Sequence, residues 1–179
     1  RRASAWNPLE AGATTDGLRA FLARMPATDS NHGHRHHYCS PHTDLLGWII
    51  ERASGSAFSL SFSELLMQPL GAAHDGYVTL DAFGAPRVAG GICVAPHDLL
   101  RFAEMVRNFG TVGTRQIVPE DWIAEFRSFD DTGPWQRQQD GPRHFPHGSY
   151  RSKWYRSGLP DGEFAAIGIH GQWIWVNPA

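Results

Sequence analysis

Three features are scarce in this sequence of 179 residues: long apolar runs, an excess of charge of one sign, and cysteine. No stretch comes near the roughly 18 to 20 consecutive apolar residues that a transmembrane helix needs, so no membrane span is predicted. The 16 basic and 18 acidic residues are mixed along the chain, which argues against a nucleic-acid partner and against an anionic membrane surface. A small substrate that is uncharged or zwitterionic fits this balance better.

Cysteine is limited to Cys39 and Cys93, which do not form a C-x-x-C pair. Nothing in their spacing demands a disulfide, and we predict that both thiols are reduced. Residues 1–4 are not followed by the apolar core of a signal peptide, and our expectation for the compartment is the cytoplasm. Because the chain lacks an initiator methionine and stops directly after an apolar run, we expect it to be truncated at both ends.

The sequence does have enough apolar residues, 41% of the total, for one sizeable core. Apolar residues recur at helical spacing in four stretches, at 18–25, 45–53, 99–106 and 122–126. Aromatic and β-branched runs, which are typical of strands, come last, at 153–155, 164–169 and 173–176. We therefore predict an α+β fold in a single domain, with a helical region and cleft loops over 1–150 and the first strands of an antiparallel sheet over 151–179.

The strongest helix signal begins at Ser40, which we predict to be the N-cap. Pro41 is then the first helical residue, because proline lacks only a donor that has no partner at that position. Gly55 is expected to end the helix. The predicted buried face of this helix contains its apolar residues, among them Leu45, Trp48 and Ile49.

Two further segments carry local signals. Residues 61–64, Ser-Phe-Ser-Glu, match a capping box and predict the start of a short helix that closes at Pro69. Residues 128–148 are rich in Gly, Pro, Asp, Gln and His, which predicts a long surface loop of the kind that often shapes a binding cleft.

Three motifs in order resemble the serine β-lactamase and penicillin-binding family. Tyr38-Cys39-Ser40 and the helix after it are similar to the second motif of that family, Tyr-x-Asn or Tyr-x-Ser. Residues 89–102, which open with Ala-Gly-Gly-Ile, resemble the turn and helix that come next. Residues 166–172, Ala-Ile-Gly-Ile-His-Gly-Gln, resemble the third motif, which is Lys-Thr-Gly in penicillin-recognising enzymes. The similarity is greatest to the branch of class C β-lactamases, esterases and 6-aminohexanoate-dimer hydrolases, and it implies a β-lactamase/transpeptidase-like fold for one catalytic domain.

The sequence departs from the family at three positions. Its single lysine, Lys153, has Tyr150 three residues before it, so the Ser-x-x-Lys motif that carries the nucleophile is absent. We expect a missing N-terminal segment to supply that motif and to complete the site. Ala166 stands in place of the lysine of the third motif, which favours amide or ester hydrolysis over a β-lactam carboxylate pocket. Ala89 stands where nylon-oligomer hydrolases carry a polar residue that contacts substrate.

The resemblance implies a serine hydrolase that works through an acyl-enzyme on a small amide or ester. A serine hydroxyl attacks a carbonyl only if a neighbouring group accepts its proton and donors stabilise the oxyanion. The family assigns the first task to the tyrosine and a lysine, and therefore to Tyr38 here. Tyr38 lies just before a helix whose positive end favours a phenolate or a strongly hydrogen-bonded phenol. Ser40 passes a proton or holds the lysine, and the backbone N–H of Ile169, expected on an edge strand, serves the oxyanion.

The same resemblance implies a set of substrate-binding residues and no cofactor. Gly168 and Gly171 permit a ligand to approach the backbone closely, although hairpin glycines of this kind also occur without a site. His170 lines the cleft or orients the strand. Trp6 sits where related hydrolases place a mobile aromatic side chain over the cleft.

Two other classes of function remain open. The first is a catalytically inactive ligand-binding homologue of the proposed hydrolase, which has lost its nucleophile. The second is a metal-binding loop, because six residues of types that can bind a metal cluster near the tyrosine motif: His32, His34, His36, His37, Cys39 and His42. This run lies in a polar loop rather than on rigid elements, so we predict a solvated loop and no metal.

The missing Ser-x-x-Lys motif leads to a prediction about the chain on its own. We expect it neither to hydrolyse a chromogenic short-chain ester nor to be labelled by a serine-directed phosphonate, because no activated hydroxyl is present. Intact-mass spectrometry after incubation with the phosphonate measures the labelling. Stoichiometric modification of any one serine would contradict this prediction.

Overall fold

The computed structural model describes residues 16–26, 32–137 and 145–179. The chain divides into two compact units. The first, here called the helical unit, comprises Arg1–Thr28, Tyr38–Gln68 and Ala73–Ala95, and the second, the sheet unit, comprises Asp29–His37, Pro69–Ala72 and Pro96–Ala179. Each unit is described by itself. The predicted organisation, one catalytic domain with a helical region over 1–150 and the first strands of a sheet over 151–179, stays a prediction.

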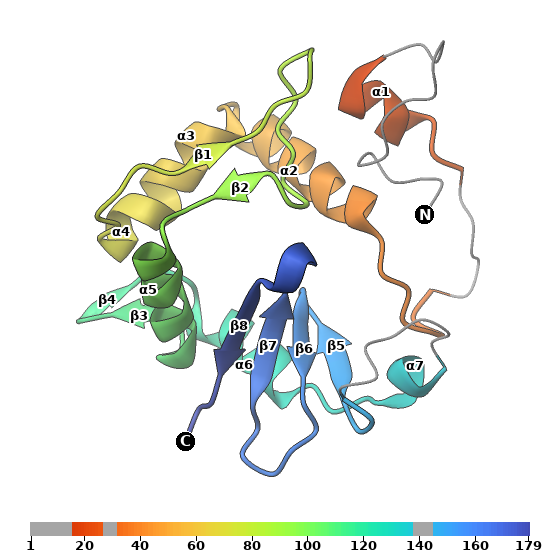
Figure 1. The fold of residues 1–179 in the computed structure, drawn as a ribbon, viewed down its shortest axis with the longest axis vertical. Helices are drawn as coiled ribbons and strands as arrows, with labels where there is room; N and C mark the ends of the chain where they lie inside the picture. The colour runs from red at the N-terminus through yellow and green to blue at the C-terminus, as the bar shows by residue number, and fades with distance from the viewer. Residues whose placement is uncertain (1–15, 27–31, 138–144) are drawn as a thin grey trace. The chain divides into compact units, whose positions relative to one another are not determined.

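The helical unit is built around one long helix, α2 (Figure 1). Its elements are α1 (Gly17–Ala23), α2 (Ser40–Ser54), α3 (Phe58–Phe62), a π-helical turn (Ser63–Met67) and the antiparallel pair β1 (Tyr77–Val78) and β2 (Ile92–Cys93). The short helix α4 (Gln68–Leu70) follows the π-helical turn. The helices predicted before Pro26 and between Ser40 and Gly55 are confirmed, and Gly55 ends α2 in the left-handed conformation with φ of 67°.

The buried face of α2 differs from the prediction. Leu45 and Ile49, predicted to be buried, are 38% and 51% exposed, whereas Pro41, Asp44 and Gly47 are buried. The reason is a close approach of the chain at Val88, where a Cβ on Gly47 would lie 2.3 Å from the Val88 Cγ2 atom. A small residue is therefore required at position 47, and the side of α2 that carries it faces inward even though it is less apolar.

The predicted capping box at residues 61–64 is also wrong. Ser61 lies inside α3, which begins after Ala57, and Ser63 begins the π-helical turn. The start of α3 is served instead from α2, since the backbone N–H of Phe58 donates to Glu51 Oε1 at 3.2 Å. A carboxylate from another helix thus satisfies a donor that the local sequence was expected to satisfy.

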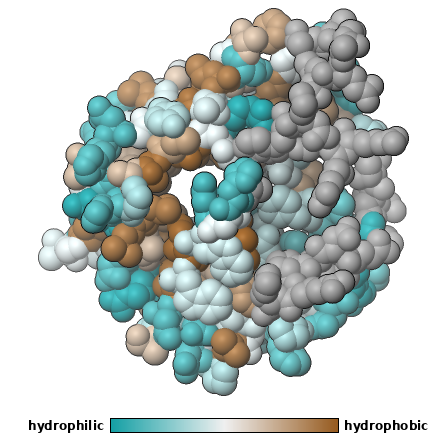
Figure 2. Space-filling view, in the orientation of Figure 1, coloured by the Kyte–Doolittle hydropathy of each residue, from teal (hydrophilic) through white to brown (hydrophobic). Residues whose placement is uncertain are grey.

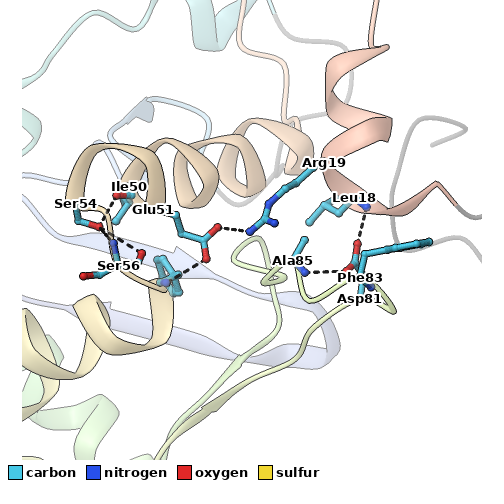
Figure 3. A network of polar contacts seen from close by, with 10 residues as sticks. Leu18, Arg19, Ile50, Glu51, Ser54, Ser56, Asp81, Phe83 and Ala85 are labelled. Atoms are coloured by element: carbon cyan, nitrogen blue, oxygen red, sulfur yellow. Dashed lines mark hydrogen bonds and ion pairs between the residues drawn. The ribbon is translucent and has the colours of Figure 1, made fainter.

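Two carboxylates connect the segments of the helical unit (Figure 3). Glu51 on α2 also accepts a hydrogen bond from Arg19 of α1, with 2.6 Å between Nη2 and Oε2. Asp81 accepts three backbone N–H groups, from Leu18 at 2.6 Å, Phe83 at 2.9 Å and Ala85 at 2.8 Å. Partial burial acts to raise the pKa of Asp81, but the three N–H groups outweigh it and lower that pKa below its ordinary value.

The sheet unit contains a four-stranded antiparallel sheet in the order β5-β6-β7-β8 (Figure 1). Its strands are β5 (Ser149–Arg151), β6 (Trp154–Arg156), β7 (Phe164–Ile167) and β8 (Trp173–Val176). Before them come α5 (Pro96–Arg107), the hairpin of β3 (Thr111–Val112) and β4 (Arg115–Gln116), α6 (Glu120–Ser128) and α7 (Gly133–Gln136). The α+β class is confirmed. Strand β5 was not predicted, and α7 lies in the stretch predicted to be a loop.

Aromatic side chains fill both faces of this sheet. On one face, Trp154 stacks on Phe126 of α6 at 5.6 Å between ring centroids and on Phe102 of α5 at 6.3 Å. On the other face, strand register places Tyr150, Tyr155, Ala165 and Trp175 in one row, covered by Trp135 and Phe145. Strand β7 is therefore packed against side chains on both of its faces and is paired with a strand on each edge.

The surface shows hydrophobic residues among hydrophilic ones, with brown areas in the regions of α2 and α5 (Figure 2). Exposed apolar residues on these helices include Leu46, Ile49 and Leu100. Within the described ranges, no helix combines the length and the apolar character needed to cross a membrane.

Candidate active site

Tyr38 begins the second segment of the helical unit, two residues before the first residue of α2. Its side chain is 55% exposed. Among the residues that the structure describes, none forms a hydrogen bond with its hydroxyl. The described residues therefore leave the phenol hydroxyl unoccupied.

Ser40 is the first residue of α2 and not its N-cap, which corrects the prediction. Cys39 takes the cap position, with φ of −137° and ψ of 99°, and its carbonyl accepts the His42 N–H at 3.2 Å. The chain turns helical one residue earlier than predicted, so Pro41 is the second helical residue. In the described part of the chain no side chain caps α2, and the Ser40 hydroxyl is not engaged in that role.

Asp44 fastens the Ala-Gly-Gly turn to α2. Its carboxylate is 1% exposed, and its Oδ1 atom accepts the backbone N–H of Ala89 at 2.8 Å. The Arg87 guanidinium lies on the other side, with 3.9 Å between Nε and Oδ2. Burial raises the pKa of Asp44 above its ordinary value, and the Ala89 N–H and the Arg87 charge only partly oppose this effect.

The turn itself depends on Gly91. A Cβ at this position would lie 2.1 Å from Thr79 Oγ1 and 2.6 Å from the Arg87 carbonyl oxygen. The Gly91 N–H donates to that carbonyl at 2.6 Å, and the Gly91 carbonyl accepts the Thr79 N–H at 2.8 Å. The backbone of the turn is thus packed too closely for any side chain.

The second group of predicted residues forms the turn between β7 and β8. Strand β7 ends at Ile167, and Ile169–Gly171 form a 3₁₀ turn, so Ile169 lies beyond the strand in which it was predicted. Strand β7 also lies between β6 and β8 and is not an edge strand among the four. The strand ends here because His170 and Gly171 adopt positive φ values of 61° and 76°.

The two glycines of this turn have different structural roles. The Gly168 N–H donates to the Gln172 carbonyl at 2.7 Å, and a Cβ on Gly168 would lie 3.3 Å from the Gln172 Cβ. Gly171 has open space around it and is required for its backbone conformation instead. His170 is exposed, so its imidazole is accessible to a bound molecule.

The structure thus distributes the predicted site over both units. Tyr38 and Ser40 lie together at the start of α2 in the helical unit, and residues 168–171 lie together in the sheet unit. Trp6 lies outside the described residues. The sequence analysis did not identify Asp44 as a residue that holds the Ala-Gly-Gly turn. The available signal was that Asp44 lies three residues before Gly47, which places both on one side of a helix.

The histidine loop does not assemble a ligand set. Over residues 16–26, 32–137 and 145–179, no three His, Cys, Asp or Glu side chains are grouped so that they hold a metal ion. The side chains of His32, His34, His37 and His42 are exposed, and only His36 is partly buried. Cys39 and Cys93 are free thiols.

Comparisons with known proteins agree with these motifs. The family described as Beta-lactamase matches residues 2–179. The 6-aminohexanoate-dimer hydrolase of Paenarthrobacter ureafaciens is 31% identical over 141 residues, which cover 79% of this chain and 36% of that protein. The sequence therefore spans about a third of this relative's length.

Two solved structures have the same fold at low identity. A Bacillus anthracis protein provisionally described as a 6-aminohexanoate-dimer hydrolase superposes with a TM-score of 0.78 at 20% identity, over 90% of this chain and 40% of the other. A Bacteroides dorei protein provisionally described as a beta-lactamase gives 0.70 at 23% identity, over 95% of this chain and 56% of the other. Together with the family match, these superpositions confirm the predicted β-lactamase/transpeptidase-like fold.

A substitution at Asp44 tests the attachment of the Ala-Gly-Gly turn. Asp44→Ala removes the acceptor of the buried Ala89 N–H, and we expect it to lower the free energy of unfolding by about 1–3 kcal/mol. Asp44→Asn keeps an oxygen in place and is the matched control. Urea unfolding of the protein measures both, and equal stability of the alanine variant and wild type would contradict the role of Asp44.

The raised pKa of Asp44 adds a pH dependence to this comparison. The folded protein holds the Asp44 proton more tightly than the unfolded chain does, so this group stabilises fully below its ordinary pKa of 3.8. As the pH rises through the raised pKa, wild type should lose stability relative to Asp44→Asn. If the difference in the free energy of unfolding between wild type and Asp44→Asn does not change with pH, the Asp44 carboxylate has the same pKa in the folded and unfolded protein.

The exposed histidines lead to a prediction about metal removal. We expect treatment with a chelator to leave the melting temperature of the protein unchanged, because the described histidines share no ligand geometry. Differential scanning calorimetry with and without chelator measures this. A lower melting temperature that zinc restores would instead assign a metal site to the loop.

Proposed function

Because this chain belongs to the beta-lactamase family, we propose that the intact protein is a serine hydrolase that cleaves a small amide or ester through an acyl-enzyme. One observation carries the proposal: Tyr38, which opens the Tyr-x-Ser sequence, is 55% exposed and has a hydroxyl unoccupied by the described residues. The chain spans 36% of its curated relative, so the Ser-x-x-Lys nucleophile is assigned to a part of the protein outside this sequence.

The proposed reaction proceeds in two halves. The serine hydroxyl oxygen bonds to the substrate carbonyl carbon while its proton passes to the pair formed by Tyr38 and the lysine. The tetrahedral oxyanion then collapses, the bond to the leaving group breaks, and the amine or alcohol departs with a proton from the same pair. Water repeats the sequence on the ester that remains and releases the acid.

The start of α2 supports a proton-transfer role for Tyr38. A helix of fifteen residues carries a partial positive charge at its N-terminus, and negative charge near that end is favoured. Tyr38 lies two residues before the first residue of this helix. Ser40 lies in the first turn with a hydroxyl that does not cap the helix, so it is available to relay a proton or to hold the lysine.

The turn after β7 supports the oxyanion role of the Ile169 N–H. An oxyanion hole works only if its donors are rigidly placed before the reaction. Strand β7 is paired on both sides, and the Gly168 N–H bond to Gln172 ties the base of the turn. In this proposal, the positive φ values at His170 and Gly171 shape the backbone beside Ile169, and His170 and the two glycines contact substrate.

The proposed substrate class follows from what replaces the third-motif lysine. Ala166 on β7 brings no charge to bind a β-lactam carboxylate, which favours a small amide or ester that is neutral or zwitterionic. The name of the curated relative, a 6-aminohexanoate-dimer hydrolase, fits an amide of this kind. We propose no cofactor, no nucleic-acid or membrane partner, and a cytoplasmic location.

A catalytically inactive ligand-binding homologue is the second candidate, because Ser-x-x-Lys is absent from this sequence. Phosphonate labelling of the intact protein separates the two. Labelling of one serine in a Ser-x-x-Lys motif supports the hydrolase, and ligand binding without labelling supports the homologue.

The catalytic role of Tyr38 is tested by Tyr38→Phe in the intact protein. We expect kcat to fall by roughly 10²- to 10⁴-fold, the range for loss of a general acid–base group, and the acylation burst with an activated ester to slow equally. The melting temperature should change little, because the ring remains and the hydroxyl has no partner among the described residues.

Tyr77→Phe is the matched control, since Tyr77 is a similarly exposed tyrosine on β1 of the same unit. We expect it to leave kcat unchanged. An unaltered burst rate in Tyr38→Phe would remove the basis of the proposed mechanism.

A further inference from the structure

His36 differs from the other residues of the histidine loop. Of residues 32–37 it alone is not exposed. Its imidazole meets three aromatic rings, with centroid separations of 4.6 Å to Tyr150, 5.2 Å to Trp135 and 6.4 Å to Tyr155. These rings, here called the aromatic cage, come from β5, α7 and β6 of the sheet unit.

The backbone around His36 is fastened to the same unit. The His36 N–H donates to the Pro134 carbonyl at 2.8 Å, and Arg137 Nε donates to the His34 carbonyl at 2.5 Å. Pro134 precedes Trp135 on α7, and Arg137 is the residue that follows this helix. Residues 34–36 are therefore held by a ring contact and two hydrogen bonds, although their composition is that of a solvated loop.

The wall of the cage does not depend on His36. Trp135 is 3% exposed, and its Nε1–H donates to the Phe145 carbonyl at 2.7 Å. Trp135, Phe145 and Tyr155 form the buried core on this face of the sheet. Removal of the imidazole therefore leaves a preformed cavity rather than a collapsed sheet.

We propose that His36 is a positioning residue for Tyr38. Residue 37 ends a segment of the sheet unit, and Tyr38 begins the next segment of the helical unit. Two peptide links join His36 to Tyr38, so their Cα atoms lie at most about 7.6 Å apart. Whatever holds His36 in the cage thereby limits the positions open to the Tyr38 phenol. This inference rests on the proposed function, because it assigns Tyr38 a catalytic role.

The predicted signature is a loss in kcat rather than in KM. Tyr38 transfers a proton in the transition state, so its misplacement weakens transition-state stabilisation and leaves substrate binding nearly unchanged. A displacement of about 1 Å in a catalytic group is enough for a loss of order 10²-fold.

The experiment compares variants of the intact enzyme with an activated ester. We expect His36→Ala to lower kcat by about 10- to 100-fold with KM within about threefold, and His36→Leu, which fills more of the cage, to show an intermediate loss. His36→Phe should recover most of the lost kcat, because it restores an aromatic ring to the cage. His37→Ala is the matched control, since its imidazole is exposed and adjacent to Tyr38, and it should leave kcat unchanged.

A double-mutant cycle with Tyr38→Phe shows whether His36 acts through Tyr38. If it does, His36→Ala should cost little further kcat once the phenol hydroxyl is absent. Fully additive losses, or a lower melting temperature with normal kcat in both His36→Ala and His36→Leu, would overturn the inference alone. An active enzyme that is indifferent to Tyr38→Phe would overturn the proposed role of Tyr38, and this inference with it.

Discussion

The arrangement of the helical unit depends on one buried carboxylate. Asp44 accepts the Ala89 N–H at 2.8 Å and attaches the Ala-Gly-Gly turn to α2. Gly47 and Glu51 continue the same side of the helix, where Gly47 admits Val88 and Glu51 binds both Arg19 and the start of α3. A side of α2 with few apolar atoms therefore organises its neighbours, through hydrogen bonds and close approach rather than through hydrophobic area.

The sheet unit reaches rigidity by a different route. Trp154 and its partners Phe102 and Phe126 fill one face, and the row of Tyr150, Tyr155, Ala165 and Trp175 fills the other. Strand β7 is thus packed on both faces and paired on both edges. This packing holds the start of the turn that follows the strand. A backbone N–H proposed to stabilise an oxyanion requires such a support, because it contributes only if it is oriented before charge develops.

Polar composition was a poor guide to structure in the segment before Tyr38. The histidines there suggested a solvated loop, and most of them are exposed. His36 is the exception because α7 and two strands, which lie about a hundred residues later in the chain, present aromatic rings to it. An imidazole is flat and largely apolar on its faces, so it packs against such rings as readily as it is solvated.

The sequence by itself determined the α+β class, the C-terminal end of α2, and the order of the three motifs, because periodicity, Gly55 and local spacing depend on near neighbours. Several features followed only from the tertiary structure. These are the buried side of α2, the capping of α3 by Glu51, the cage around His36, and the turn that holds Ile169 beyond its strand. Each depends on partners distant in sequence or on backbone conformation, as Asp44 and Ala89 illustrate at a separation of 45 residues. Local propensity carries no information about such partners, because they become neighbours only when the chain folds.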